Sequence, residues 1–204
     1  MGNTLELYRL DWQTLASVIG SGDRNLVAAI DTDYDQRMFM GEDAAIQKIL
    51  WRKTVEALVA GRRGEELREL TAADPSYREE VSDLAALAMV SIIRSQGTQV
   101  GTIEHNSGSG EQFRDDFLAA VPKAIGLSAT AEEIISRPLC GLIHPIYPSW
   151  GGLSQADLAQ AFKVVSLDNL PSLDDSDLDG WLYDFIDALE TVHEAKSDLV
   201  TLYL

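Results

Sequence analysis

The chain has 204 residues, of which 46% are hydrophobic, so it can bury the core of one large domain. Its 33 acidic and 16 basic side chains give a formal net charge of −17, which argues against nucleic acid as a direct partner because phosphates are neutralised by Lys and Arg. One cysteine excludes an intramolecular disulfide, and the lack of a signal peptide and of an apolar run of about 18 residues predicts a cytoplasmic protein that does not enter a membrane.

The first half of the chain begins with a predicted strand and continues as helices. Alternating apolar residues predict the strand over 4–10. Apolar residues at helical spacing, with capping residues before them and glycines after them, predict the helices that follow. These helices cover 11–20, 21–30, 41–61 and 74–97.

The second half has weaker signals, except at its end. Residues 98–111 read as a short strand or an extended piece that runs into a Gly/Ser loop. Helices are then predicted over 111–121, 130–136, 153–166 and 176–197, and the stretch 137–152 between them has no regular pattern. Ser154 and Asp157 predict a capping box for the helix over 153–166, as Asp11 predicts the N-cap of the helix over 11–20. Residues 198–204 close the chain as a strand.

The positions of the strands predict the architecture. The clearest strands lie at the two ends of the chain, and a lone strand leaves its backbone groups unpaired. We therefore expect 4–10 to pair with 198–204, with 99–105 as a third candidate strand. The sequence predicts a mostly helical α+β fold, with a small sheet formed by the N- and C-terminal strands, in a single domain over 1–204.

Four stretches of this sequence resemble a family of uncharacterised bacterial proteins of the kind seen in actinobacteria. They are LYRLDWQTLASVIGSGD (7–23), DPSYREEVSDLAALAMV with the later SQG (74–97), YPSWGGLS (147–154) and AKSDLVTLYL (195–204). The resemblance spans most of the chain and implies a single α+β domain of unknown function. It carries over no catalytic residue.

The acidic stretch before the last predicted helix has the first half of a calcium-loop pattern. Asp175, Asp177 and Asp179 fill the first three ligand positions, and a glycine follows. Ile186 stands where a calcium loop needs a bidentate Glu, and Pro171 interrupts the helix that should enter the loop. The pattern therefore favours an acidic helix start, in which carboxylates complement the helix dipole. These three aspartates are also candidate contacts for a basic partner, and we predict neither a metal nor a cofactor.

The irregular stretch 137–152 contains a second candidate binding region. Prolines and glycines shape the backbone around His144, Tyr147 and Trp150, and such aromatic-bearing loops often bind ligands or partners. The alternative is structural packing, which is also the simpler interpretation of Cys140, because an isolated cysteine in an apolar context is more often an inert core residue.

A Gly-rich turn over 18–27 raises the question of phosphate binding. Backbone amides of such a turn can cradle a phosphate before a helix, but no Lys follows and Asp23 would repel the anion. A joint between two helices is the favoured interpretation.

Two classes of function remain open. Residues 151–204 hold 11 acids and 2 bases, and no catalytic motif is present, so we favour a non-catalytic acidic binding protein, immunity- or antitoxin-like, that docks a basic partner. The alternative is a small hydrolase or transferase in which His105 or His144 acts in a Gly/Pro-rich cleft.

Overall fold

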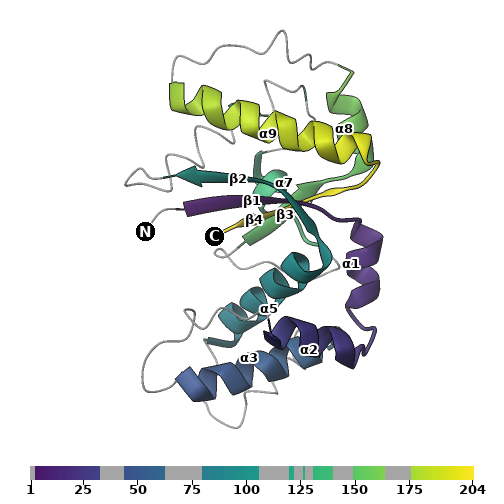
Figure 1. Ribbon diagram of the computed structural model, residues 1–204, viewed down its shortest axis with the longest axis vertical. Coiled ribbons are helices and arrows are strands. Elements are labelled where there is room, and N and C mark those ends of the chain that lie inside the picture. Colours follow the sequence, from purple (N-terminus) through teal and green to yellow (C-terminus); the bar gives the residue numbers. More distant parts are fainter. Residues whose placement is uncertain are drawn as a thin grey trace.

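The computed structural model describes residues 3–32, 44–62, 80–105, 120–121, 126, 131–139, 149–163 and 176–204. In this part of the chain, a four-stranded antiparallel sheet lies between two groups of helices (Figure 1). The predicted fold class is confirmed, because the protein is mostly helical and its small sheet includes the N- and C-terminal strands.

The sheet has the order β2-β1-β4-β3. Its strands are β1 (Asn3–Arg9), β2 (Thr98–His105), β3 (Ser149–Leu153) and β4 (Leu199–Tyr203). The two ends of the chain pair as predicted, with Leu5 opposite Tyr203, and β2 is the expected third strand. Backbone bonds of 2.7 and 2.8 Å between Thr4 and Leu204 extend this pairing to the end of the chain.

Strand β3 corrects the prediction of an irregular segment through residue 152. Gly151 and Gly152, which suggested a loop, are required here because neighbouring backbone atoms lie too close to leave room for a side chain. A Cβ on Gly151 would collide with the carbonyl of Ile134, and one on Gly152 would collide with the carbonyl of Leu199. Only glycine lets the neighbouring helix and strand come this near.

The helices on one side of the sheet are α1 (Trp12–Val18), α2 (Arg24–Thr32), α3 (Ala44–Val59) and α5 (Glu80–Gln96), of which α5 lies next to the sheet and α2 and α3 lie beyond it (Figure 1). Their apolar side chains pack on Tyr8, Val200 and Leu202 of the sheet. The turn between α1 and α2 docks on the end of α3, where the N–H groups of Gly20 and Gly22 both donate to the carbonyl of Val59 at 2.9 Å. These two amides are used inside the fold, so the turn is a helix joint, as the sequence favoured.

The other face is covered by α7 (Ala131–Ile135), α8 (Gln155–Ala161) and α9 (Ser176–Glu194) (Figure 1). Here Leu199 and Tyr203 of β4 point into the core. Because helices cover both faces of the sheet, all five residues of β4 are buried, which explains its mainly apolar sequence. The polar exception is Thr201, whose hydroxyl donates to the backbone carbonyl of Ile134. No helix in the described ranges is long and apolar enough to cross a membrane.

Candidate functional site

Helix α9 is anchored by an apolar stripe that follows the helical period. Six side chains on this stripe are at most 1% exposed, and they pack against the sheet and its neighbouring helices: Leu182, Phe185, Ile186, Ala188, Leu189 and Val192. Helical spacing from Trp181 onward in the sequence predicts Trp181, Phe185, Ala188, Leu189 and Val192 as core; the last four belong to this stripe, and Trp181 is partly buried against it. Burial of one side of the helix fixes which residues face outward.

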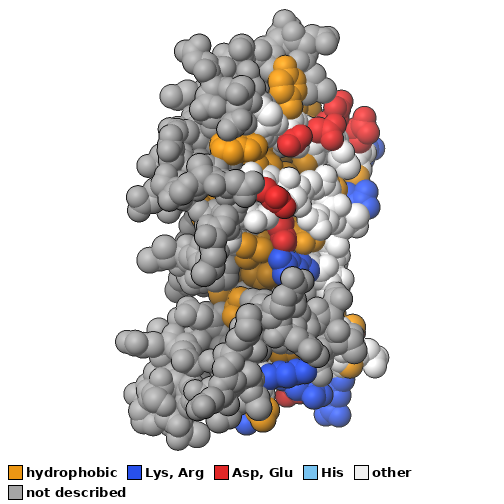
Figure 2. Space-filling model, turned by 60° about the vertical axis from the view of Figure 1, so that its left-hand side comes forward, with side chains coloured by type: hydrophobic (Ala, Val, Ile, Leu, Met, Phe, Trp, Pro, Cys, Tyr) orange, Lys and Arg blue, Asp and Glu red, His pale blue; other side chains and the backbone are white. Residues whose placement is uncertain are grey.

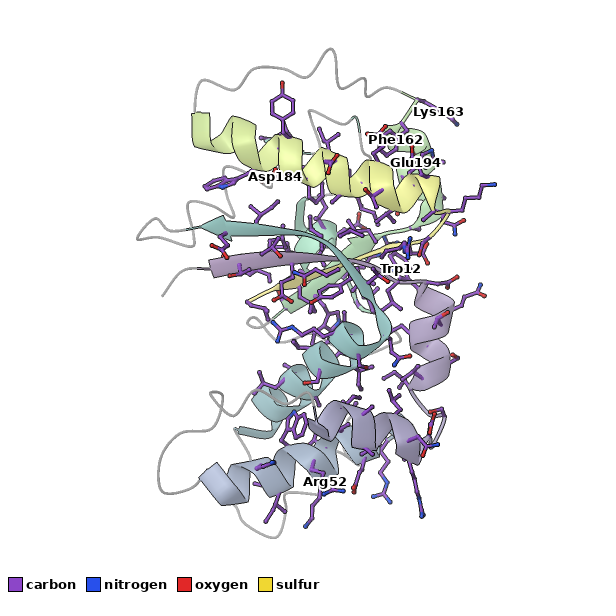
Figure 3. All side chains as sticks on the ribbon, in the orientation of Figure 1. Trp12, Arg52, Phe162, Lys163, Asp184 and Glu194 are labelled. Carbon is purple, nitrogen blue, oxygen red and sulfur yellow. The ribbon has the colours of Figure 1, made fainter. Side chains whose placement is uncertain are left out.

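The outward side of α9 is acidic. Asp184, Asp187 and Glu194 are exposed, Glu190 is half-buried, and Tyr183 beside them is 53% exposed. We call these five residues the acidic face of α9. The 19 residues of the helix include no Lys or Arg. Figure 2 shows acidic side chains gathered at the height that α9 occupies in Figure 1, and Figure 3 labels Asp184 and Glu194 on the helix.

The negative charges of this face destabilise helix α9. Asp184, Asp187, Glu190 and Glu194 are spaced by three or four residues, where like charges repel by about 0.2–0.5 kcal/mol per pair. Glu190 and Glu194 also lie near the C-terminal end, where the helix dipole disfavours a negative charge by about 0.3–1 kcal/mol. The arrangement is therefore not explained by helix formation.

The last turn of α9 is held in a defined position. The N–H of Ser197 donates to the carbonyl of Val192 and the N–H of Lys196 to that of His193, which together form a Schellman motif. Lys196 has a φ of 53°, a left-handed conformation that usually belongs to glycine. The ring of His193 stacks on Phe162 of the segment after α8, with centroids 4.7 Å apart.

A polar cluster joins the start of β4 to two helices. The Asp198 carboxylate accepts the backbone N–H of Trp12 and that of Gln155, each at 2.9 Å, and these are the first residues of α1 and α8. Arg137 places its guanidinium 4.6 Å from the centre of the Trp12 ring. Each of these groups is engaged within the fold, so we assign the cluster a structural role.

The side chain of Asp157 belongs to the same region and completes the cap of α8. It accepts hydrogen bonds from Ser154 Oγ at 2.7 Å and from the Ser154 backbone N–H at 2.9 Å, and the backbone N–H of Asp157 donates to Ser154 Oγ at 3.2 Å, which completes a capping box. Burial by itself would raise the pKa of Asp157. The bonds from Ser154 and the guanidinium of Arg137, 3.3 Å away, outweigh burial and lower the pKa.

A second charged group lies between the sheet and α5. The Tyr8 hydroxyl donates to Glu6 at 2.8 Å, and Arg94 binds both carboxylate oxygens of Glu6, at 2.6 and 3.0 Å. Burial, together with the bond to Glu6, raises the pKa of Tyr8 far above its usual value. This phenol stays protonated near neutral pH, and the group ties β1 to α5.

The predicted acidic helix start is confirmed by the backbone. Asp177, Asp179 and the following Gly180 lie in the first turns of α9, so these positions of the calcium pattern are helical and do not form a calcium loop. Asp175 lies outside the described residues. No group of three or more His, Cys, Asp and Glu that could hold a metal occurs among the described side chains. A binding role for the three aspartates stays a prediction.

The other predicted site residues are only partly within the described chain. Trp150 lies in β3, where its side chain is 2% exposed and packs in the core with α3 and α5. His144 and Tyr147 lie outside the described residues. His105 ends β2, but its side chain is outside them too. A shared cleft between His105 and His144 therefore stays untested.

Comparison of the chain with protein-family models, with curated proteins and with solved structures found no match. Membership of the actinobacterial-type family suggested by the four sequence stretches stays a prediction. Any assignment of function thus depends on the surfaces of the chain itself.

Proposed function

We propose that the chain is a non-catalytic acidic binding module, immunity- or antitoxin-like, that docks a basic protein through the acidic face of α9. The observation that carries this proposal is the exposed stripe of Tyr183, Asp184, Asp187 and Glu194 on a helix with no Lys or Arg. A well-buried opposite side holds this stripe on a rigid element of the fold.

The extent of the face indicates what kind of ligand it takes. From Asp184 to Glu194 the helix rises about 15 Å, which is too long for one ion and suits a row of cations on another protein. Tyr183 adds an exposed aromatic ring, which attracts Lys and Arg side chains through its π-face. Aromatic residues inside a charged rim are common in protein interfaces.

Electrostatics supports the same assignment. Cations of the partner would relieve the repulsion between neighbouring carboxylates on α9. The repulsion that destabilises the helix in the free chain would therefore favour formation of the complex. The field of a chain with a net charge of −17 also speeds the encounter with a basic protein. Such a complex weakens steeply as salt screens the charges.

A matched pair of variants tests the proposal. Immobilised wild-type chain is expected to retain a basic protein from host extract at low salt and to release it at high salt. Asp184→Asn combined with Asp187→Asn should abolish this retention. Glu56→Gln combined with Glu104→Gln removes the same charge from exposed positions on α3 and β2 and should leave retention unchanged. Equal retention by both double variants, or retention of acidic proteins only, would show that the acidic face of α9 is not the docking surface.

A further inference from the structure

Helix α3 carries an exposed face of the opposite sign. Lys48, Arg52 and Lys53 are exposed on it, and Ile49 between them is 56% exposed. These four residues are the basic face of α3. One exposed acid, Glu56, lies beside them and pairs with Arg52 at 3.5 Å. Cations therefore outnumber acids on this face, in a chain whose net charge is strongly negative.

The two faces match each other in composition. Ile49 and Tyr183 are the exposed large hydrophobic side chains found in the described part of the chain, and each lies within one of the two oppositely charged faces. Each face thus combines one large exposed apolar side chain with charged neighbours, and both kinds of side chain occur together in protein interfaces. Figure 2 shows basic side chains gathered at the height of α3 and acidic ones at the height of α9.

We propose that the basic face of α3 docks on the acidic face of α9 in a second copy of this chain. This inference rests on the proposed function, because both use the acidic face of α9 for docking. Here the partner is a second copy of the chain, identified because the chain itself carries a face of the opposite charge. The faces lie at opposite ends of the molecule, with Arg52 at one end and Asp184 at the other (Figures 1 and 3). Each contact therefore leaves one face free on each copy, and association proceeds head to tail.

The net charge of −17 sets the conditions for this association. At about 0.1 M salt the Debye length is about 10 Å, so most of the charge on two docked copies is screened while ion pairs at about 4 Å persist. At much lower salt the two negative molecules repel over their whole extent, and at much higher salt the contact pairs weaken. Association is therefore strongest at intermediate salt, whereas purely apolar association would simply strengthen with added salt.

Sedimentation velocity of the full chain tests the inference, at about 10–500 µM protein and at about 0.02, 0.1 and 0.5 M salt. We expect concentration-dependent growth beyond the dimer that is strongest at the middle salt concentration. Two double variants, Lys48→Glu with Lys53→Glu and Asp184→Lys with Asp187→Lys, should each weaken association at least about tenfold. An equimolar mixture of the two should restore it, because the reversed α9 face then meets the reversed α3 face.

Controls separate local contact from net charge and from misfolding. Arg9→Glu with Arg24→Glu, two exposed positions outside α3 and α9, has the same net charge as Lys48→Glu with Lys53→Glu and should associate as wild type does. Ile49→Ser changes no charge and should also weaken association. A wild-type chain that is monomeric under all conditions, or association that persists in both reversed variants, overturns the inference. Retention of a basic protein from extract remains a separate result and decides the proposed function independently.

Discussion

The backbone N–H of Trp12 donates to the carboxylate of Asp198, 186 residues later in the chain. The second oxygen of the same carboxylate accepts the N–H of Gln155, so one side chain caps the first residues of α1 and α8. This cap lies directly after the Schellman turn that ends α9 and before β4. It therefore holds the end of α9 against the rest of the fold.

Replacing Asp198 tests this double cap. Loss of a helix cap destabilises a protein by about 1 kcal/mol, so Asp198→Ala should lower the free energy of unfolding by about 2 kcal/mol. Asp198→Asn keeps one acceptor oxygen and should lose about half as much. Urea unfolding gives the comparison, with Asp11→Ala, which removes the side chain capping α1 alone, as a reference of about 1 kcal/mol. A loss for Asp198→Ala no greater than for Asp11→Ala would contradict the double role.

The left-handed residue after α9 gives a stabilising substitution. Lys196 has a φ of 53°, and a residue with a Cβ is disfavoured there by about 1 kcal/mol relative to glycine. Lys196→Gly should therefore raise the free energy of unfolding by up to about 1 kcal/mol. The equivalent position after α3 is already Gly61, with a φ of 84°. Gly61→Ala should lower stability, because its Cβ would also approach the Cα of Gly20 to 3.0 Å.

The buried phenol of Tyr8 predicts a loss of stability in alkali. Folding raises the pKa of Tyr8 above the unfolded value of about 10, so the folded chain holds this proton more tightly than the unfolded chain does. The contribution of Tyr8 to the free energy of unfolding is complete below about pH 10 and declines as the pH rises further. Urea midpoints between about pH 8 and 11 should fall less steeply for Tyr8→Phe than for wild type. Parallel curves for the two proteins would contradict the assigned environment of Tyr8.

The acidic face of α9 predicts a conflict between stability and binding. Glu194 lies in the last turn of the helix, where a positive charge complements the dipole. Glu194→Lys should therefore raise the free energy of unfolding by about 0.5–1 kcal/mol while weakening retention of the basic partner. Thermal unfolding and the retention assay measure the two effects on one protein. A variant that is less stable than wild type and still retains the partner fully would contradict both the destabilising effect of Glu194 and its part in docking.

Periodicity and capping residues predicted much of the fold. Asp11 and the Ser154–Asp157 box cap the helices they were expected to cap, and the strands at the two ends of the chain pair. Strand β3 was not predicted, because Gly151 and Gly152 are loop formers by propensity. Their role depends on the carbonyls of Ile134 and Leu199, which only the tertiary structure brings near.

The candidate site was predicted less well. The sequence pointed to Asp175, Asp177 and Asp179, because they repeat a ligand pattern. The helical period that predicted the buried stripe also places Asp184 and Asp187 on the opposite, outward side of the same helix. What periodicity could not show is which surface is left uncovered, since that depends on how α9 packs on the sheet.

Zero-length cross-linking of carboxylates to amines in host extract tests the docking role of α9 most directly. The wild-type chain would be cross-linked at low salt, and the joined peptides would be mapped. We predict cross-links from Asp184, Asp187 and Glu194 to lysines of a basic protein, and their loss at high salt. The proposal would be contradicted if cross-links formed only at other carboxylates, such as Asp11 and Glu104, and the carboxylates of α9 were joined to no partner.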